Sequence, residues 1–96
     1  MPVRNTTTDL MDAVKEAMGI ESDYGLSKLL GINRTAVSNY RNGRSQASDE
    51  IALRMAGIIK RAPAPILAQL ASDRAVSPDV AKVWREAAKV LARASR

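Results

Sequence analysis

The chain contains neither cysteine nor histidine. The absence of cysteine excludes disulfide bonds and thiolate chemistry, and the absence of both residue types excludes the usual zinc sites. The sequence also lacks a glycine-rich phosphate loop and a nucleophile elbow. Asp9 and Asp12 share one helix face without any context that forms a pocket, so we expect them to cap and solubilise a helix. We therefore expect a protein that is not an enzyme and that uses no metal or cofactor.

Long apolar runs are missing as well. No run approaches the roughly 18 residues of a membrane span, and the N-terminus lacks the apolar stretch of a secretion signal. These absences predict a soluble, cytoplasmic protein with no membrane partner, in whatever cell makes it. Proline and glycine are scarce, at four and five residues in 96, and alanine is frequent, which predicts an all-α fold. A chain of this length suits a single domain, residues 1–96, with a core that needs no disulfides.

Apolar residues recur at helical spacing along most of the chain. Capping residues and prolines mark the ends of these segments. The expected helices cover roughly residues 8–18, 23–30, 34–42, 49–61, 65–72 and 77–96.

The most informative stretch runs from Asp23 to Gly43. Gly31 is expected to end one helix, because glycine adopts a left-handed conformation without steric cost. Asn33 is a good N-cap for the next helix. Ser27 is small and lies on the inner side of the first helix, so the second helix can approach closely. The stretch therefore predicts two short helices joined by a tight turn.

This stretch resembles the helix-turn-helix of the phage repressor and Cro class, the lambda-repressor-like family. In that motif a small residue precedes the turn glycine by four positions, as Ser27 precedes Gly31. An apolar residue follows the glycine, here Ile32, and two more lie six and nine positions beyond it, here Val37 and Tyr40. The chain departs from the family at Asp23, where members often have a glutamine that touches phosphate.

A narrower resemblance covers nearly the whole chain. The segments SDYGLSKLLGINRTAVSNYRNG and ASDEIALRMAGII, with a late tryptophan, are similar to a small family encoded by filamentous phages and prophages. Together the resemblances imply a bundle of four to five helices over residues 8–72 that binds DNA, plus an additional C-terminal helix over 77–96. They also imply a sequence-specific transcriptional repressor that binds a near-palindromic operator as a homodimer. No small-molecule ligand is expected.

Within the second helix of the motif, Val37 and Tyr40 turn inward and leave four polar residues outward for base reading. Arg34 can pair bidentately with guanine and Asn39 with adenine, while Thr35 and Ser38 offer hydroxyl groups. Three residues at and beyond the helix end are better placed for phosphates, which position a domain without reading sequence. These are Arg41, Asn42 and Arg44.

The net charge of +5 is unevenly distributed. Residues 33–44 hold three arginines and no acid, whereas residues 9–23 hold five acids and one lysine. A field polarised in this way favours a polyanion on one side of the molecule.

The C-terminal helix carries an apolar stripe beside a basic face. The stripe either packs on the chain's own core or forms a dimer surface with Trp84 as its anchor. The candidate dimer residues are Leu67, Leu70, Val80, Val83, Trp84, Ala87 and Leu91. An alternative function is a protein-interaction module, such as an antitoxin or anti-repressor partner, that uses this helix.

Overall fold

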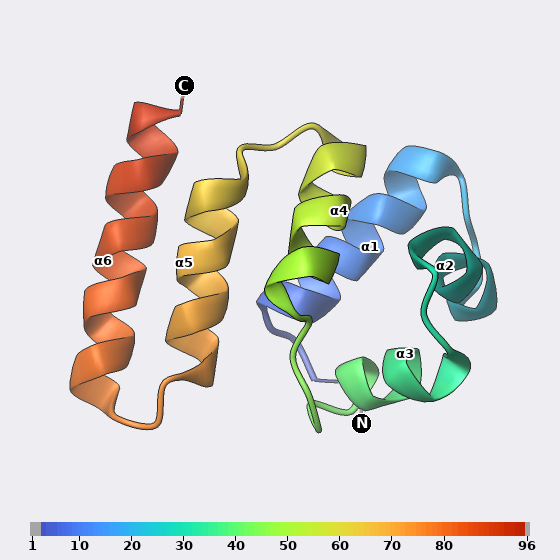
Figure 1. Ribbon diagram of the computed structural model, residues 1–96, viewed down its shortest axis with the longest axis horizontal. Helices are drawn as coiled ribbons and strands as arrows, with labels where there is room; N and C mark the ends of the chain where they lie inside the picture. The colour runs from blue at the N-terminus through green and yellow to red at the C-terminus, as the bar shows by residue number, and fades with distance from the viewer. Residues whose placement is uncertain (1–2, 96) are drawn as a thin grey trace.

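The computed structural model describes residues 3–95, and within that range it consists of six α-helices without a strand (Figure 1). The predicted all-α fold is therefore confirmed for these residues. The Cα radius of gyration is 13.2 Å, close to the value expected for one compact domain of about 100 residues. The helices are α1 Thr6–Met18, α2 Asp23–Leu30, α3 Arg34–Arg41, α4 Asp49–Ile59, α5 Pro63–Arg74 and α6 Pro78–Ala94.

Local capping explains where α1 begins. The Asn5 side chain accepts a hydrogen bond from the Thr8 N–H, and the Thr8 hydroxyl accepts one from the Asn5 N–H. This reciprocal pair is a capping box. The helix therefore starts at Thr6, two residues before the predicted position, because Asn5 and not one of the threonines is the N-cap.

The core lies mainly between α1, α2 and α4, with α3 and one side of α5 closing it. Its largest fully buried side chains include Met11, Leu26 and Met55. The loop before α4 is fixed to this core by Thr7, whose hydroxyl donates to Gln46 Oε1 at 2.8 Å and accepts from the Ala47 N–H at 3.1 Å. No buried side-chain nitrogen or oxygen of the described residues lacks a hydrogen-bond partner.

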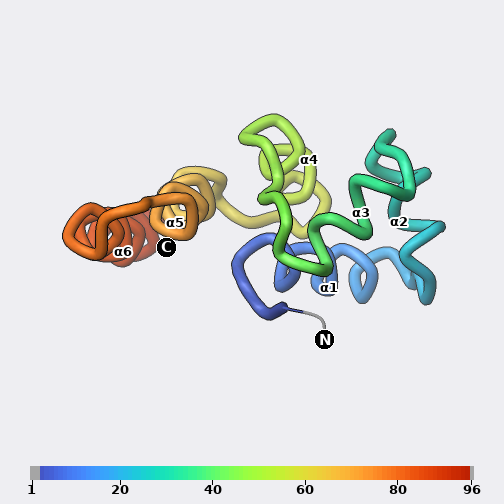
Figure 2. The backbone as a smooth tube through the Cα atoms, turned by 90° about the horizontal axis from the view of Figure 1, so that it is seen from below, coloured from blue at the N-terminus to red at the C-terminus, as the bar shows by residue number. Residues whose placement is uncertain are grey.

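The last two helices form a hairpin on one flank of the molecule. α5 packs against α1 and α4, whereas α5 is the only one of the described helices that packs against α6 (Figure 1). α5 begins at Pro63, earlier than the predicted Pro65. Both prolines fall in its first turn, where a backbone N–H has no partner within the helix and none is needed. The buried Ser72 hydroxyl donates to the Ala81 carbonyl at 2.9 Å and ties the two helices together. As a result α6 lies at the opposite end of the molecule from α2 and α3 (Figure 2).

Among the residues described, no helix combines the length and the apolar character required to cross a membrane.

Candidate nucleic-acid interface

The turn between α2 and α3 is built as the sequence predicts. Gly31 adopts the left-handed conformation with φ 71°, and the Ile32 N–H donates to the Ser27 carbonyl at 3.0 Å. This pattern closes a helix and satisfies its last carbonyl groups. The Asn33 side chain then accepts from the Ala36 N–H at 2.7 Å and starts α3. The turn therefore holds α3 in a fixed direction relative to α2.

α3 buries its apolar side and exposes its polar side. Val37 and Tyr40 are buried, as predicted. Arg34, Thr35 and Ser38 are exposed, whereas the fourth predicted base-reading residue, Asn39, is half-buried. At about 100° per residue, the three exposed side chains lie within one sector of roughly 100° of the helix. They form a continuous polar surface that contains no acidic residue.

Arg41, predicted to contact phosphate, is instead bound by two carboxylates of its own chain. Its Nε and Nη2 atoms donate to Asp23 at 3.1 and 2.9 Å, and Nη1 lies 2.8 Å from Asp12 Oδ1. Lys15 Nζ donates to the same Asp23 at 3.1 Å. Only 19% of the Arg41 side chain is exposed. This network joins α1, α2 and α3 at the base of the polar surface, so Arg41 acts as an internal connector and not as a free cation.

The network shifts two pKa values. The hydrogen bonds from Arg41 lower the pKa of Asp23 below its ordinary value, although partial burial opposes this change. The hydrogen bonds from Arg41 to Asp23, more than to Asp12, raise the pKa of Arg41 in turn. Both groups are therefore charged at neutral pH. Asp23 therefore has a structural task, and Asp12 does more than cap and solubilise.

Asn42 and Arg44, the other two residues predicted to contact phosphate, are both exposed. The Asn42 amide donates to the Ser38 carbonyl at 3.0 Å and so helps to close the end of α3. Arg44 follows α3, and its backbone N–H donates to the Asn39 carbonyl at 2.9 Å. No carboxylate of residues 3–95 forms a salt bridge with Arg44, so its guanidinium is available to an external anion.

Tyr24 also belongs to this surface, although the sequence pattern had assigned it no role. Its ring is half exposed, with Lys28 Nζ 4.6 Å and Arg34 Cζ 5.3 Å from the ring centroid. Both distances suit a cation–π contact. A hollow of about 270 Å³ lies beside the ring and is lined by residues of both helices, including Val37 and Ser38. The cue in the sequence was the spacing of Tyr24 and Lys28, which are one helical turn apart.

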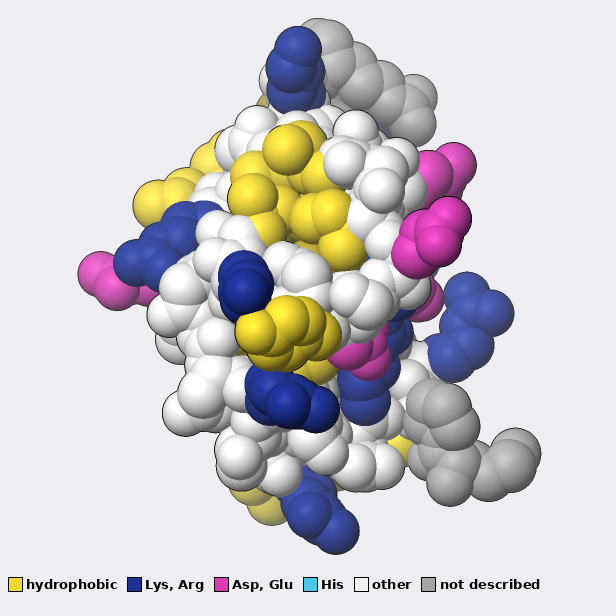
Figure 3. Space-filling model, turned by 90° about the vertical axis from the view of Figure 1, so that its right-hand side faces the viewer, with side chains coloured by type: hydrophobic (Ala, Val, Ile, Leu, Met, Phe, Trp, Pro, Cys, Tyr) yellow, Lys and Arg dark blue, Asp and Glu magenta, His cyan; other side chains and the backbone are white. Residues whose placement is uncertain are grey.

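The charged and apolar groups of this end of the molecule are closely mixed. Figure 3 shows basic, acidic and apolar side chains next to one another on the face that contains α2. Near α3, Asp12 and Asp23 pair with Arg41. Arg34, Lys28 and Arg44 are exposed cations. The α2–α3 region therefore exposes three cations, and part of its acidic charge is already paired.

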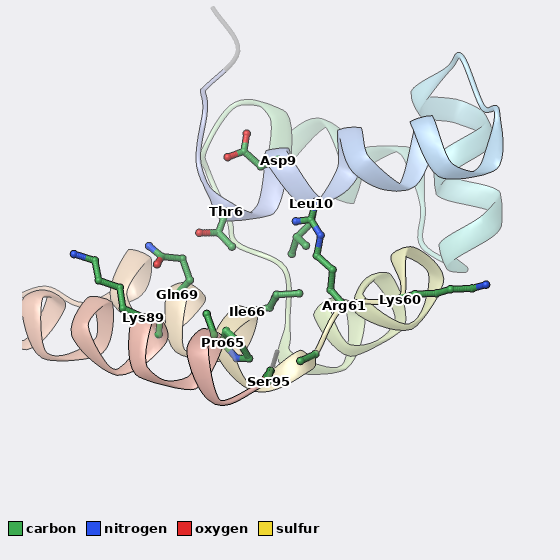
Figure 4. A pocket seen from close by; sticks show the side chains of 13 residues that line it. Thr6, Asp9, Leu10, Lys60, Arg61, Pro65, Ile66, Gln69, Lys89 and Ser95 are labelled. Carbon is green, nitrogen blue, oxygen red and sulfur yellow. The ribbon is translucent and has the colours of Figure 1, made fainter.

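A larger groove of about 860 Å³ lies between α1, the end of α4, α5 and α6. Its lining includes Ile66 and Ala88, and its charged groups come from α1, from the connection after α4 and from α6. The side chains of Lys60 and Lys89 point away from one another (Figure 4). No cluster of three His, Cys, Asp or Glu residues suited to a metal ion occurs within residues 3–95. The two lysines of the groove therefore do not converge on one point.

The candidate dimer residues divide between the core and the surface. Leu70 is fully buried and Leu67 packs against the core, so these two residues of α5 are part of the chain's own interior. On α6 only Ala88 is buried, and the large side chains remain exposed, from 36% for Leu91 to 65% for Val83. We define the α6 surface as Val80, Val83, Trp84, Ala87, Val90 and Leu91.

Comparison with known proteins finds a phage-encoded relative of the chain. Over 86 residues it is 34% identical to the uncharacterized protein Gp-c of Pseudoalteromonas phage PM2, and the match covers 84% of this chain and 92% of Gp-c. The chain belongs to the Gp-c family. No protein-family model matches the chain, and no solved structure matches it. Membership of the Gp-c family therefore establishes a phage-encoded relative without assigning an activity.

Proposed function

We propose that this member of the Gp-c family is a sequence-specific double-stranded DNA-binding transcriptional regulator. In this proposal α2 and α3 form a helix-turn-helix of the phage repressor and Cro class, and α3 enters the major groove. The observation that carries the proposal is the exposed, acid-free face of α3, which a fixed turn holds in place and which is accompanied in the motif by the exposed cations Lys28, Arg34 and Arg44. Phosphate attraction supplies most of the affinity of such a surface, and base edges supply its specificity.

The exposed residues of α3 take the base-reading roles. Arg34 is suited to guanine, and Thr35 and Ser38 are suited to hydroxyl-mediated contacts. Asn39 is half-buried and contributes at the edge of the contact. Arg44 and Asn42 serve phosphates, whereas Arg41 holds α3 against α1 and α2 through Asp12 and Asp23.

Tyr24 has a supporting role in this proposal. Its ring lies between Lys28 and Arg34, so it restricts the rotamers of Arg34 before DNA arrives. A side chain that is ordered in advance loses less entropy on binding. Tyr24 therefore favours the orientation in which Arg34 reads a base.

The regulatory mechanism would be occupancy. One recognition helix buries too little surface for tight and specific binding, so the proposed regulator is a homodimer on a near-palindromic operator. Its position on the operator blocks polymerase and represses transcription in the host cytoplasm, where the protein associates with the nucleoid. This mechanism requires no cofactor and no small-molecule ligand.

A gel shift titrated with salt tests the proposal. The DNA is the region upstream of the protein's own gene, with an unrelated duplex as competitor. We expect a specific shift. The logarithm of the affinity for DNA should fall linearly with the logarithm of the salt concentration. Absence of a shift at low salt, with a folded protein, would contradict the proposal.

A second candidate function follows from the α6 surface. Exposed apolar patches mark interaction sites, so the chain can also be read as a protein-interaction module, such as an antitoxin or anti-repressor partner. This alternative predicts that α6 binds another protein and that Arg34→Ala has no effect on function. The same gel shift separates the two candidates, because only the DNA-binding regulator retards a duplex.

A further inference from the structure

The apolar sector of α6 is wider than α5 can cover. At about 100° per residue, the six residues of the α6 surface fill a sector of roughly 120°. The alanines that face α5, among them Ala81 and Ala88, occupy the sector next to it. The charged residues of α6 fall on the remaining side. A broad, uncharged apolar sector therefore stays in contact with water in the isolated chain.

The order of side-chain size along this sector is nearly symmetric. Ala87 lies at its centre, with Val83 and Trp84 one turn before it and Val90 and Leu91 one turn after it. Two such helices in antiparallel orientation place Val83 of one copy against Leu91 of the other, and Trp84 against Val90. The small side chains at Ala87 let the two helix axes approach closely at the centre.

The charges beside the sector favour the same orientation. Asp79 lies near the start of α6 and Arg93 near its end, on the same edge of the apolar sector. In an antiparallel pair Asp79 of each copy lies beside Arg93 of the other. The two helix dipoles also oppose one another in this orientation.

We propose that α6 pairs antiparallel with α6 of a second copy of this chain, with Ala87 on the two-fold axis. The hairpins of α5 and α6 from two copies then form a four-helix bundle, an arrangement that covers each α6 on both sides. α3 lies at the other end of each copy and stays uncovered (Figure 2). The inference deepens the proposed function, because it gives the homodimer its interface, but pairing itself does not require DNA.

Single cysteines in the full-length chain test this pairing directly, because the natural chain contains no cysteine. A disulfide needs Cα atoms about 4.4–6.8 Å apart, a separation that closely packed helices offer only at facing positions. Under mild oxidation without DNA, we expect Ala87→Cys to form a covalent dimer of twice the 10.4 kDa chain mass. The matched control is Lys82→Cys, on the charged side of the same helix, which should remain monomeric on a non-reducing gel.

The orientation is tested with two further variants. An equimolar mixture of Val83→Cys and Leu91→Cys should cross-link, whereas Val83→Cys alone should cross-link far less. Efficient self-linkage of Val83→Cys would overturn the antiparallel orientation. An Ala87→Cys yield no greater than that of Lys82→Cys would overturn the pairing.

Sedimentation of the unmodified chain at micromolar concentration keeps the test independent of these variants. A dimer supports the inference, and a strict monomer overturns it. Because no DNA is present, a dimer that fails the gel shift would reject DNA binding and retain the α6 pair. A monomer that binds DNA would reject the α6 pair and retain DNA binding.

Discussion

The surface of α3 and the surface of α6 lie at opposite ends of the molecule and differ in what they expose. α3 places its apolar side in the core and turns polar and basic groups to water, which solvates them at little cost. α6 buries only a narrow strip against α5 and leaves five large apolar side chains exposed. Water is a poor partner for the second surface and a good one for the first. In our proposals a second copy of the chain covers the α6 surface, whereas the α3 surface stays hydrated until DNA binds.

Arginines that are close to one another in the sequence also have different tasks. Arg34, Arg41 and Arg44 lie within 11 positions of one another in the sequence, yet only Arg41 is enclosed by carboxylates. Substitutions at the two surfaces should therefore separate assembly, recognition and folding.

The largest effect is expected from Val83→Glu. Val83 is 65% exposed, so the isolated fold should tolerate a carboxylate at this position. A pair of α6 helices, in contrast, would have to bury two carboxylates. We expect a monomer in sedimentation, and operator affinity lowered by about 10²–10⁴-fold, because avidity is lost. Val76→Glu, at a fully exposed valine outside α6, is the matched control and should leave both properties unchanged. Equal losses of dimerisation and operator affinity in the two variants would contradict pairing through α6.

Arg34→Ala tests recognition at the other surface. We expect a loss of about 1–3 kcal/mol on the operator and relaxed discrimination at one base pair. The melting temperature should barely change, because Arg34 is exposed. Arg85→Ala, an exposed arginine on α6, serves as the control. Unchanged base preference in Arg34→Ala would show that α3 has been assigned the wrong role.

Arg41 and Arg44 should separate folding from phosphate binding. Arg41→Ala leaves Asp23 and Asp12 without their arginine and should lower the free energy of unfolding by about 1–2 kcal/mol, between the values for exposed and buried ion pairs. Arg44→Ala should leave that free energy unchanged. It should instead flatten the salt dependence of DNA affinity by about one unit per contact in a monomer and two in a dimer. Urea unfolding measures the free energy of unfolding, and salt titration measures the salt dependence of DNA affinity. A stability loss in Arg44→Ala together with a flatter salt dependence in a fully stable Arg41→Ala would refute these assignments.

The Asp23 network should also be visible in acid. The pKa of Asp23 is lowered in the folded chain, so its contribution to stability is fully present above the ordinary value of 3.8. That contribution is lost as the pH falls from 3.8 through the folded-state pKa. Asp23→Asn should therefore be less stable than the natural chain at pH 7, with the difference narrowing below pH 3.8. A difference that is constant from pH 7 to acid would count against an ionised pair.

The smallest effect is expected at Tyr24. Tyr24→Leu removes the aromatic face beneath Arg34 and should weaken operator binding by about 0.5–1 kcal/mol, the value of an exposed cation–π contact. Tyr24→Phe keeps the ring and should bind like the natural chain. A double-mutant cycle with Arg34→Ala measures the coupling, and strict additivity would show that Tyr24 acts independently of Arg34.

Local signals explain why much of this architecture could be predicted. Gly31 and Asn33 determine the turn through their own backbone and side-chain preferences, so α2 and α3 follow from neighbouring residues. The ion pairs of Arg41 could not be predicted, because Asp23 and Asp12 are distant in the sequence and become neighbours only when three helices pack. Leu70 illustrates the same limit: its spacing suits a surface stripe, but only the packing of α5 on α4 and α1 shows that it is buried.

Selection from a pool of random duplexes tests whether the chain binds specific DNA sequences through α3. The full-length chain is mixed with the pool at about 0.15 M salt, where non-specific binding is weak, and the retained DNA is sequenced. We expect an enriched, near-palindromic motif. We also expect that Arg34→Ala weakens the preference at one symmetric pair of positions and that Arg85→Ala does not. Recovery of the unselected pool composition by a folded natural chain, at this salt and at lower salt, would contradict sequence-specific DNA binding through α3.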